Sequence, residues 1–185
     1  MIEIRRILCP VDFSEHSRHA LDHAVAIARW YGSTVTVLHV VSPAPVAAYA
    51  PGPLVYEPML LTTVDREQVL AHVRRFVDAE SAPGVVVESR VRDGVAAGEI
   101  LEFAIEMDAD LLVIGTHGRS GVERLVLGSV AEKVLRKARC PVLTVPRAQP
   151  DAVPAAAVVF KRILCPVDFS ETSLQALNYA MSLAQ

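Results

Sequence analysis

The sequence predicts an open, five-stranded parallel sheet with helices on both faces. Hydrophobic residues make up 52% of the 185-residue chain and aromatic residues only 5%, so Val, Ala, Leu and Ile form the core. Such a composition suits parallel strands that are buried on both faces. Strand-like and helix-like segments also alternate up to residue 147. This alternation predicts right-handed strand–helix–strand crossovers.

The individual elements follow from the hydrophobic pattern and from residues typical of helix and strand ends. Ser14 is a favourable N-cap, and Gly32 stands where a left-handed residue usually ends a helix. Thr63 caps another helix, whereas the proline-rich segment 42–58 forms a loop. The predicted strands are 3–11, 34–41, 85–91, 110–115 and 142–145, and the predicted helices are 14–31, 64–79, 96–107 and 129–138.

The expected strand order is 3-2-1-4-5, with the alternating third strand at an edge. In sheets of this kind ligands bind beyond the carboxyl ends of the strands, where the strand order reverses. The first strand ends in Pro10-Val11-Asp12, and the fourth ends in Gly115-Thr116-His117-Gly118. We therefore expect the site between these two segments.

A ten-residue segment occurs twice, as Arg6–Glu15 and again as Arg162–Glu171. The small and apolar positions after it also match at helical spacing. The predicted organisation is one domain at 1–147, a linker at 148–159, and the strand and helix that open a second, incomplete repeat at 160–185. Its strand, 163–167, is apolar on both faces, so we expect it to pack on another element or chain, or the natural protein to continue beyond Gln185.

Charge and cysteine content limit which binding partners and which cellular location we expect for the protein. The net charge is −3, which predicts no nucleic-acid partner, although residues 115–147 carry a local balance of +5. That basic stretch is either an anion site or a solvated helix face. Cys9, Cys140 and Cys165 fit neither a zinc pattern nor a disulfide framework. Without a recognisable signal peptide or an apolar span, we expect a cytoplasmic protein that contacts no membrane.

The segment with the most chemical information is Gly115-Thr116-His117-Gly118-Arg119-Ser120-Gly121, followed by Gly128-Ser129 at a helix start. Glycines allow close approach of the backbone, and successive amides form a concavity for anions. The hypothesis is that bare amides at 115, 118, 121 and 128 neutralise a polyphosphate, with Arg119 nearby. The alternative is a tight turn without a ligand. The pattern is neither a P-loop nor a Rossmann fingerprint.

Gly115-x-x-Gly118, nine residues and Gly128-Ser129 resemble the ATP-binding motif of universal stress proteins. Residues 7–14, 38–40 and 140–146 resemble that family's first, second and last strands, so the resemblance spans 1–147 in order. It implies a Rossmann-like fold related to adenine nucleotide alpha hydrolases, ATP binding and a role in the stress response. It also implies a homodimer that pairs through the last strand, Val142 to Val145.

The resemblance further implies a nucleotide-binding set drawn from both strand ends and the glycine loop. At the nucleoside end this set contains Pro10, Val11, Asp12 and the adenine contact Val40. Around ribose and phosphates it contains Gly115, Thr116, His117, Gly118, Arg119, Ser120 and Gly121, with Gly128, Ser129 and Val130 beneath the phosphates. Asp12 either holds Mg²⁺ or caps the following helix beside Ser14.

Several histidines are further candidates. His16, His19 and His23 share one helix face, which we interpret as a solvated face rather than a metal site. His39 is expected to be buried and hydrogen-bonded. His117 lies in the loop without a neighbouring carboxylate that would make it a general base. The expected function is a nucleotide-dependent regulatory module with at most slow ATP hydrolysis; the alternatives are a nucleotide hydrolase or nucleotidyl transferase, or an interaction protein that binds no nucleotide.

Overall fold

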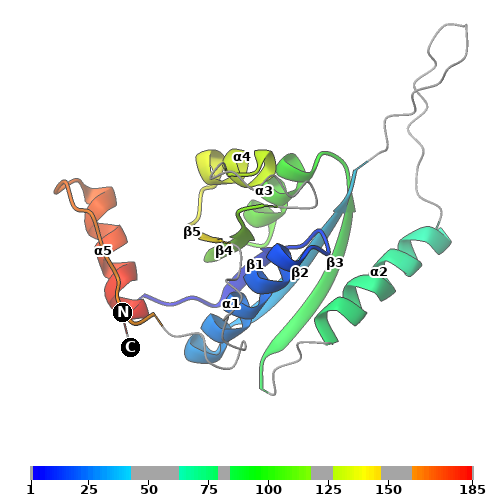
Figure 1. The fold of residues 1–185 in the computed structure, drawn as a ribbon, viewed down its shortest axis with the longest axis horizontal. Helices are drawn as coiled ribbons and strands as arrows, with labels where there is room; N and C mark the ends of the chain where they lie inside the picture. Colours follow the sequence, from blue (N-terminus) through cyan, green and yellow to red (C-terminus); the bar gives the residue numbers. More distant parts are fainter. Residues whose placement is uncertain (1, 43–62, 79–83, 118–126, 147–159, 185) are drawn as a thin grey trace, which may run out of the picture.

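The computed structural model describes residues 2–42, 63–78, 84–117, 127–146 and 160–184. Within them, five strands form one parallel sheet in the order β3-β2-β1-β4-β5, which confirms the predicted fold class (Figure 1). The strands are β1 (Arg6–Pro10), β2 (Thr34–Val41), β3 (Val86–Asp93), β4 (Leu111–Gly115) and β5 (Val142–Val145). β1 is central, with Ile7 opposite both Val35 and Leu111.

Helices cover both faces of the sheet. On one face α1 (Glu15–Tyr31) and α2 (Thr63–Asp78) enclose a core cluster that includes Ile7, Val35 and Phe76. On the other, α3 (Ala96–Glu106) and α4 (Ser129–Lys137) enclose a cluster with Leu8 and Leu112. Successive residues of a strand point to opposite faces, so Ile7 and Leu8 of β1 serve different clusters. The helices on both faces of the sheet therefore pack against the same central strand, β1.

The predicted boundaries hold closely, with one instructive difference at the start of the first strand. β1 begins at Arg6 rather than at Glu3. The Asp110 carboxylate accepts hydrogen bonds from the main-chain N–H groups of Arg5 (2.9 Å) and Arg6 (2.8 Å). A side chain thus takes the place of a neighbouring strand there, which the local sequence does not reveal.

Helix α1 begins and ends as its sequence predicts. The Ser14 hydroxyl accepts a hydrogen bond from the amide of Ser17 at 3.2 Å, and Gly32 adopts a left-handed φ of 67°. Both features satisfy backbone groups that a helix end leaves without an internal partner. The cap also fixes the direction in which the chain leaves β1, and this turn later forms one wall of the site.

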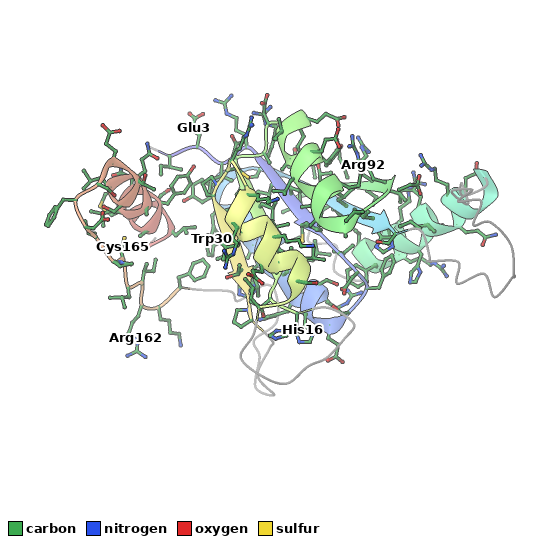
Figure 2. All side chains as sticks on the ribbon, turned by 90° about the horizontal axis from the view of Figure 1, so that it is seen from above. Glu3, His16, Trp30, Arg92, Arg162 and Cys165 are labelled. Carbon is green, nitrogen blue, oxygen red and sulfur yellow. The ribbon has the colours of Figure 1, made fainter. Side chains whose placement is uncertain are left out.

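The C-terminal segment differs from its prediction. Helix α5 (Glu171–Leu183) forms, but residues 161–168 form no strand, and Leu164 is 94% exposed. The expected strand 163–167 is therefore wrong for this structure, because no described strand pairs with its backbone. The helix, rather than a strand, contacts the domain: the Tyr31 hydroxyl donates to the carbonyl of Ser182 at 2.8 Å. Figure 2 shows Arg162 and Cys165 on this segment, apart from the sheet.

Among the described helices, none is both long enough and apolar enough to cross a bilayer.

Candidate functional site

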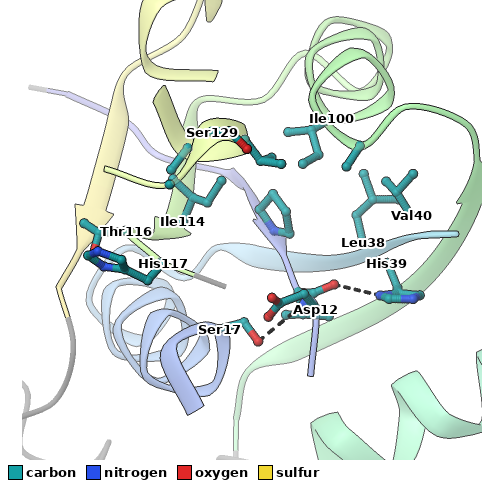
Figure 3. Close-up of a pocket in the computed structure, with 17 residues that line it drawn as sticks. Asp12, Ser17, Leu38, His39, Val40, Ile100, Ile114, Thr116, His117 and Ser129 are labelled. Carbon is teal, nitrogen blue, oxygen red and sulfur yellow. Dashed lines mark hydrogen bonds between the residues drawn. The ribbon is translucent and has the colours of Figure 1, made fainter. Parts of the chain in front are cut away.

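A cavity of about 360 Å³ lies at the carboxyl ends of β1, β2 and β4, next to the first turn of α4 (Figure 3). This is the edge of the sheet predicted from the reversal of strand order between β1 and β4. Its wall combines the β1–α1 turn, the end of β2, the start of α3 and the start of α4. The lining residues are Pro10, Val11, Asp12, Ser17, Leu38, His39, Val40, Ala96, Ile100, Ile114, Gly115, Thr116, His117, Gly128, Ser129, Val130 and Ala131.

The cavity brings together the described members of the predicted set, from Pro10 to Val130. Four predicted residues, Gly118, Arg119, Ser120 and Gly121, lie outside the described residues. The predicted set lacks the polar lining residues Ser17 and His39 and the apolar wall formed by Leu38, Ala96, Ile100, Ile114 and Ala131. Their helical or strand spacing marks them as core, and nothing local distinguishes a core residue from one that faces a cavity.

The β1–α1 turn is rigidly hydrogen-bonded around Asp12. One carboxylate oxygen, Oδ1, accepts from the amide of Ser14 at 3.1 Å and from its hydroxyl at 2.5 Å. Between them, Phe13 adopts a φ of 65°, which is uncommon for a residue with a large side chain. Asp12 therefore supports the N-cap residue Ser14, which itself caps α1, while a metal role stays a proposal.

His39 supports the same turn from β2. Its Nδ1 lies 2.8 Å from the carbonyl oxygen of Val11, and its ring centroid lies 4.3 Å from that of Phe13. A carbonyl only accepts hydrogen bonds, so Nδ1 carries the proton and donates it. The predicted hydrogen bond of His39 is confirmed, although its side chain is half-buried rather than fully buried.

The start of α4 corrects one part of the phosphate hypothesis. The amide of Gly128 donates to the carbonyl oxygen of Thr116 at 2.7 Å, so it is not bare. The next three amides, of Ser129, Val130 and Ala131, belong to the first turn and have no acceptor among the described residues. All three residues line the cavity. The donors available to an anion are thus one to three residues further along than expected.

Two glycines are required by close packing as well as by any ligand. A Cβ on Gly115 would stand 3.0 Å from the carbonyl oxygen of His16, and one on Gly128 would stand 3.1 Å from that of Thr116. Both distances are shorter than ordinary contacts between a side chain and the backbone. The tight-turn interpretation therefore explains Gly115 and Gly128 in part, whether or not a nucleotide binds.

Titratable groups around the cavity are few. Thr116 Oγ1 lies 3.0 Å from Nδ1 of His117, and the His117 ring lies 5.6 Å from that of His16. In the part of the chain that the structure describes, no three His, Cys, Asp or Glu side chains gather closely enough to hold a metal ion. Outside the cavity wall, burial raises the pKa of the Cys9 thiol, which keeps it protonated.

Comparison with known protein families identifies a match over most of the chain. The model of the universal stress protein family matches residues 3–146. A universal stress protein of Methanocaldococcus jannaschii is 37% identical over 144 residues, which cover 76% of this chain and 81% of the relative.

Solved structures of universal stress proteins are also similar to this chain. A universal stress protein from Lactobacillus plantarum superposes with a TM-score of 0.64 at 23% identity, covering 78% of this chain and 99% of its own, and supports the fold. A universal stress protein in complex with cAMP has a TM-score of 0.59 at 25% identity and covers 80% and 100% of the two chains. One from Archaeoglobus fulgidus in complex with dAMP has a TM-score of 0.55 at 25% identity and covers 78% and 98%.

Proposed function

Because the chain belongs to the universal stress protein family, we propose that it binds ATP in the cavity above β1 and β4 and acts as a nucleotide-dependent regulatory module in the stress response. The observation that carries this proposal is the first turn of α4, whose residues Ser129, Val130 and Ala131 line a cavity that also has an apolar wall. The apolar wall offers a surface for the adenine ring, and the first-turn amides, unpaired among the described residues, offer hydrogen-bond donors for the phosphates.

The apolar part of the cavity suits an adenine ring. Leu38, Val40 and Ile100 lie together in its wall, with Pro10 and Val11 at the end of β1. Ligand pockets commonly combine such a wall with a few convergent polar groups, in volumes of roughly 300–1,000 Å³. Adenine nucleotides, cAMP and dAMP, accompany two related structures, which supports the choice of base.

The phosphates belong at the opposite end, against α4. The first amides of a helix and the positive end of its dipole favour negative charge. Thr116 and His117 lie beside this end of the cavity, and we keep Gly118, Arg119, Ser120 and Gly121 in the proposed cradle. Gly128 keeps a structural role in place of direct donation, since its amide is bonded to Thr116.

Mg²⁺ is a second proposed component, carried by the carboxylate of Asp12. Oxygen ligands from carboxylate and phosphate are those that this ion prefers. Asp12 lines the same cavity as Thr116 and Ser129, which belong to the proposed phosphate end. When bound, the ion would neutralise phosphate charge; the chain's own contribution is to hold the carboxylate through Ser14.

Calorimetric titration of the full chain tests the proposal. We expect saturable binding of ATP in the presence of Mg²⁺, weaker binding of AMP, and no binding of inorganic phosphate at the same concentrations. Mass spectrometry of nucleotide retained through purification gives an independent measurement. The absence of binding in both experiments would leave a protein whose loop is structural, and the proposal would be abandoned.

A nucleotide hydrolase is the competing function, and the contact between Thr116 and His117 at the cavity is the observation in its favour. We propose at most slow hydrolysis instead. Turnover of ATP by the purified protein at or above roughly 1 s⁻¹, an ordinary rate for an enzyme, would decide for the hydrolase.

The organisation of the chain completes the proposal. Residues 1–147 form the nucleotide-binding domain, 148–159 a linker, and 160–185 the opening of a second repeat. Two such domains pair as a homodimer through β5, and the protein works in the cytoplasm. The free edge of β5, which pairs only with β4 among the described strands, is the feature that supports this dimer.

A further inference from the structure

The C-terminal segment repeats the buried face of β1 and α1 position by position, at an offset of 156 residues. Wherever residues 4–28 are buried, residues 160–184 carry the same amino acid except at four positions. The four are Phe160 for Ile4, Met181 for Val25, Ser182 for Ala26 and Leu183 for Ile27. The polar face differs much more, for example Gln175 for His19. What the two copies share is therefore the surface that faces the sheet.

The turn that leads into the helix of the copy has the backbone geometry of the original turn. Phe169 adopts the same uncommon φ of 65° as Phe13. The Ser170 hydroxyl accepts from the amide of Ser173 at 3.2 Å, and the Asp168 carboxylate accepts from the amide of Ser170 at 3.0 Å. The corresponding bonds in the original turn measure 3.2 and 3.1 Å. The turn and the start of the helix in the copy thus already have the shape that they would need in the position of the original.

Two of its apolar side chains, however, lack cover in this structure. Leu164 is 94% exposed and Phe169 86% exposed, whereas Leu8, the counterpart of Leu164, is fully buried. An exposed apolar segment of this kind indicates an interaction surface. The surface it matches, through an identical sequence, is the slot between β2 and β4 of this same domain.

We infer that residues 160–184 are an alternative β1–α1 unit, which replaces residues 4–28 between β2 and β4 of the same chain in a minor state of the protein. The elements of the sheet would then follow one another along the chain as β2 to β5 and the copy, which is a circular permutation of the same fold. Pro166, Val167 and Asp168 would take the places of Pro10, Val11 and Asp12, so the cavity would keep its β1 wall.

The connection is long enough for this exchange within one chain. Residues 146–161 separate the end of β5 from the copied strand, and an extended chain of that length reaches roughly 50 Å. The distance to cover is two strand spacings, roughly 10 Å, and one short strand length, roughly 17 Å. A tethered segment also has a high effective concentration. The contact of Tyr31 with Ser182 already holds the copy beside α1.

The original unit occupies the slot in the major state for an evident reason. Ser182 would bring a hydroxyl to the buried position of Ala26, and Phe160 would bring a larger side chain to that of Ile4. Weakening the original unit should therefore shift the equilibrium towards the copy.

The test compares three full-length variants, Leu8→Asp, Leu164→Asp and the double variant. A charge at the buried position of Leu8 excludes the original unit, and a charge at Leu164 excludes the copy. We expect Leu8→Asp to keep a cooperative thermal unfolding transition and Leu164→Asp to behave as wild type. The double variant should have no such transition. Equal loss of the transition in Leu8→Asp and in the double variant would overturn the inference.

Cysteine labelling gives a positive signature for the exchange. Cys9 is buried and Cys165 half-exposed in the original arrangement. In Leu8→Asp we expect labelling of Cys9 to rise and that of Cys165 to fall, each by about tenfold or more, while Cys140 serves as the internal reference. Unchanged labelling at both positions would contradict the exchange. Loss of the Cys165 protection when the protein is diluted would indicate exchange between chains and would overturn exchange within one chain.

A milder variant keeps the test decisive if the aspartate variant does not fold. Leu8→Ala leaves a cavity in the original unit only. We expect it to lower the unfolding midpoint less in the wild-type background than in the Leu164→Asp background. Only in the wild-type background can the copy take the place of the weakened original unit. Identical shifts in the two backgrounds would show that the copy never enters the sheet.

Discussion

The main-chain N–H of Gly128 donates to the carbonyl oxygen of Thr116 over 2.7 Å. The amide of Thr116 in turn donates to the carbonyl of Val145 at 2.9 Å. These two bonds tie the beginning of α4 to the ends of β4 and β5. The first turn of α4 is thereby held at a fixed position above the sheet, and its residues Ser129, Val130 and Ala131 line the cavity.

Substitution of Gly128 by valine should abolish nucleotide binding while the domain stays folded. The new side chain would meet the Thr116 carbonyl, 3.1 Å from its Cβ, and push the first turn of α4 away from β4. The backbone angles at Gly128, φ −59° and ψ 148°, suit any residue, so the cost is confined to this contact. Calorimetric titration with ATP and Mg²⁺ measures the loss, and circular dichroism checks the fold.

Gly98→Ala is the matched control for that variant. It lies within α3, and a Cβ there would meet no atom within 4 Å. Alanine at this position in the first turn of α3 should stabilise the domain by at most roughly 0.5–1 kcal/mol and leave ATP binding unchanged. Retention of full affinity in Gly128→Val would show that the start of α4 is not the phosphate site.

Replacement of His39 by phenylalanine should destabilise the β1–α1 turn. Phenylalanine keeps a ring near Phe13 but removes the donor that bonds the Val11 carbonyl at 2.8 Å. Loss of the partner of such a group costs roughly 1–3 kcal/mol. Urea unfolding measures the change. His72→Phe is the control, since His72 is an exposed residue of α2 whose ring stacks on that of Phe13 with the centroids 4.2 Å apart. Equal destabilisation by both variants would assign the effect to ring packing instead.

Stability should fall as the pH is lowered through the titration range of histidine. Burial, followed by the nearby His23, lowers the pKa of His19 below its ordinary 6.5, despite the Asp22 carboxylate 3.9 Å away. The unfolded chain therefore binds more protons below about pH 6.5, so the free energy of unfolding decreases towards acid. His19→Gln, the residue found at position 175 of the copy, should flatten this dependence between pH 7 and pH 5. An unchanged slope in urea unfolding would contradict the assignment.

The proposed dimer predicts opposite results at the two edges of the sheet. Thr144→Lys puts a charge on β5, and charges on an edge strand oppose pairing with another chain. We expect this variant to be a monomer by light scattering and to bind ATP. Val86→Lys puts the same charge at an exposed position on β3 and should leave the dimer intact. A monomeric wild-type protein, or a dimer that tolerates Thr144→Lys, would exclude pairing through β5.

The local sequence determines most of the fold because the signals involved act over a few residues. Ser14 and Gly32 mark the ends of α1 through their own cap geometry, and apolar runs mark β1 and β4. The strand order follows from handed crossovers between these elements. Local signals alone therefore suffice to predict that the turns at Asp12 and Gly115 lie at one edge of the sheet.

Other features depend on residues that are far apart in the sequence. Asp110 ends the pairing of β1 by binding the amides of Arg5 and Arg6, and the Thr116 carbonyl takes the amide of Gly128. Ile100 faces the cavity only because α3 packs across the end of β2. The repeated decapeptide makes the same point, since one sequence is a central strand at 6–10 and no strand at 162–166. Sequence sets what a segment is able to form, whereas tertiary structure decides which partner satisfies its backbone and covers its apolar side chains, and here only one of two equivalent segments occupies the slot between β2 and β4.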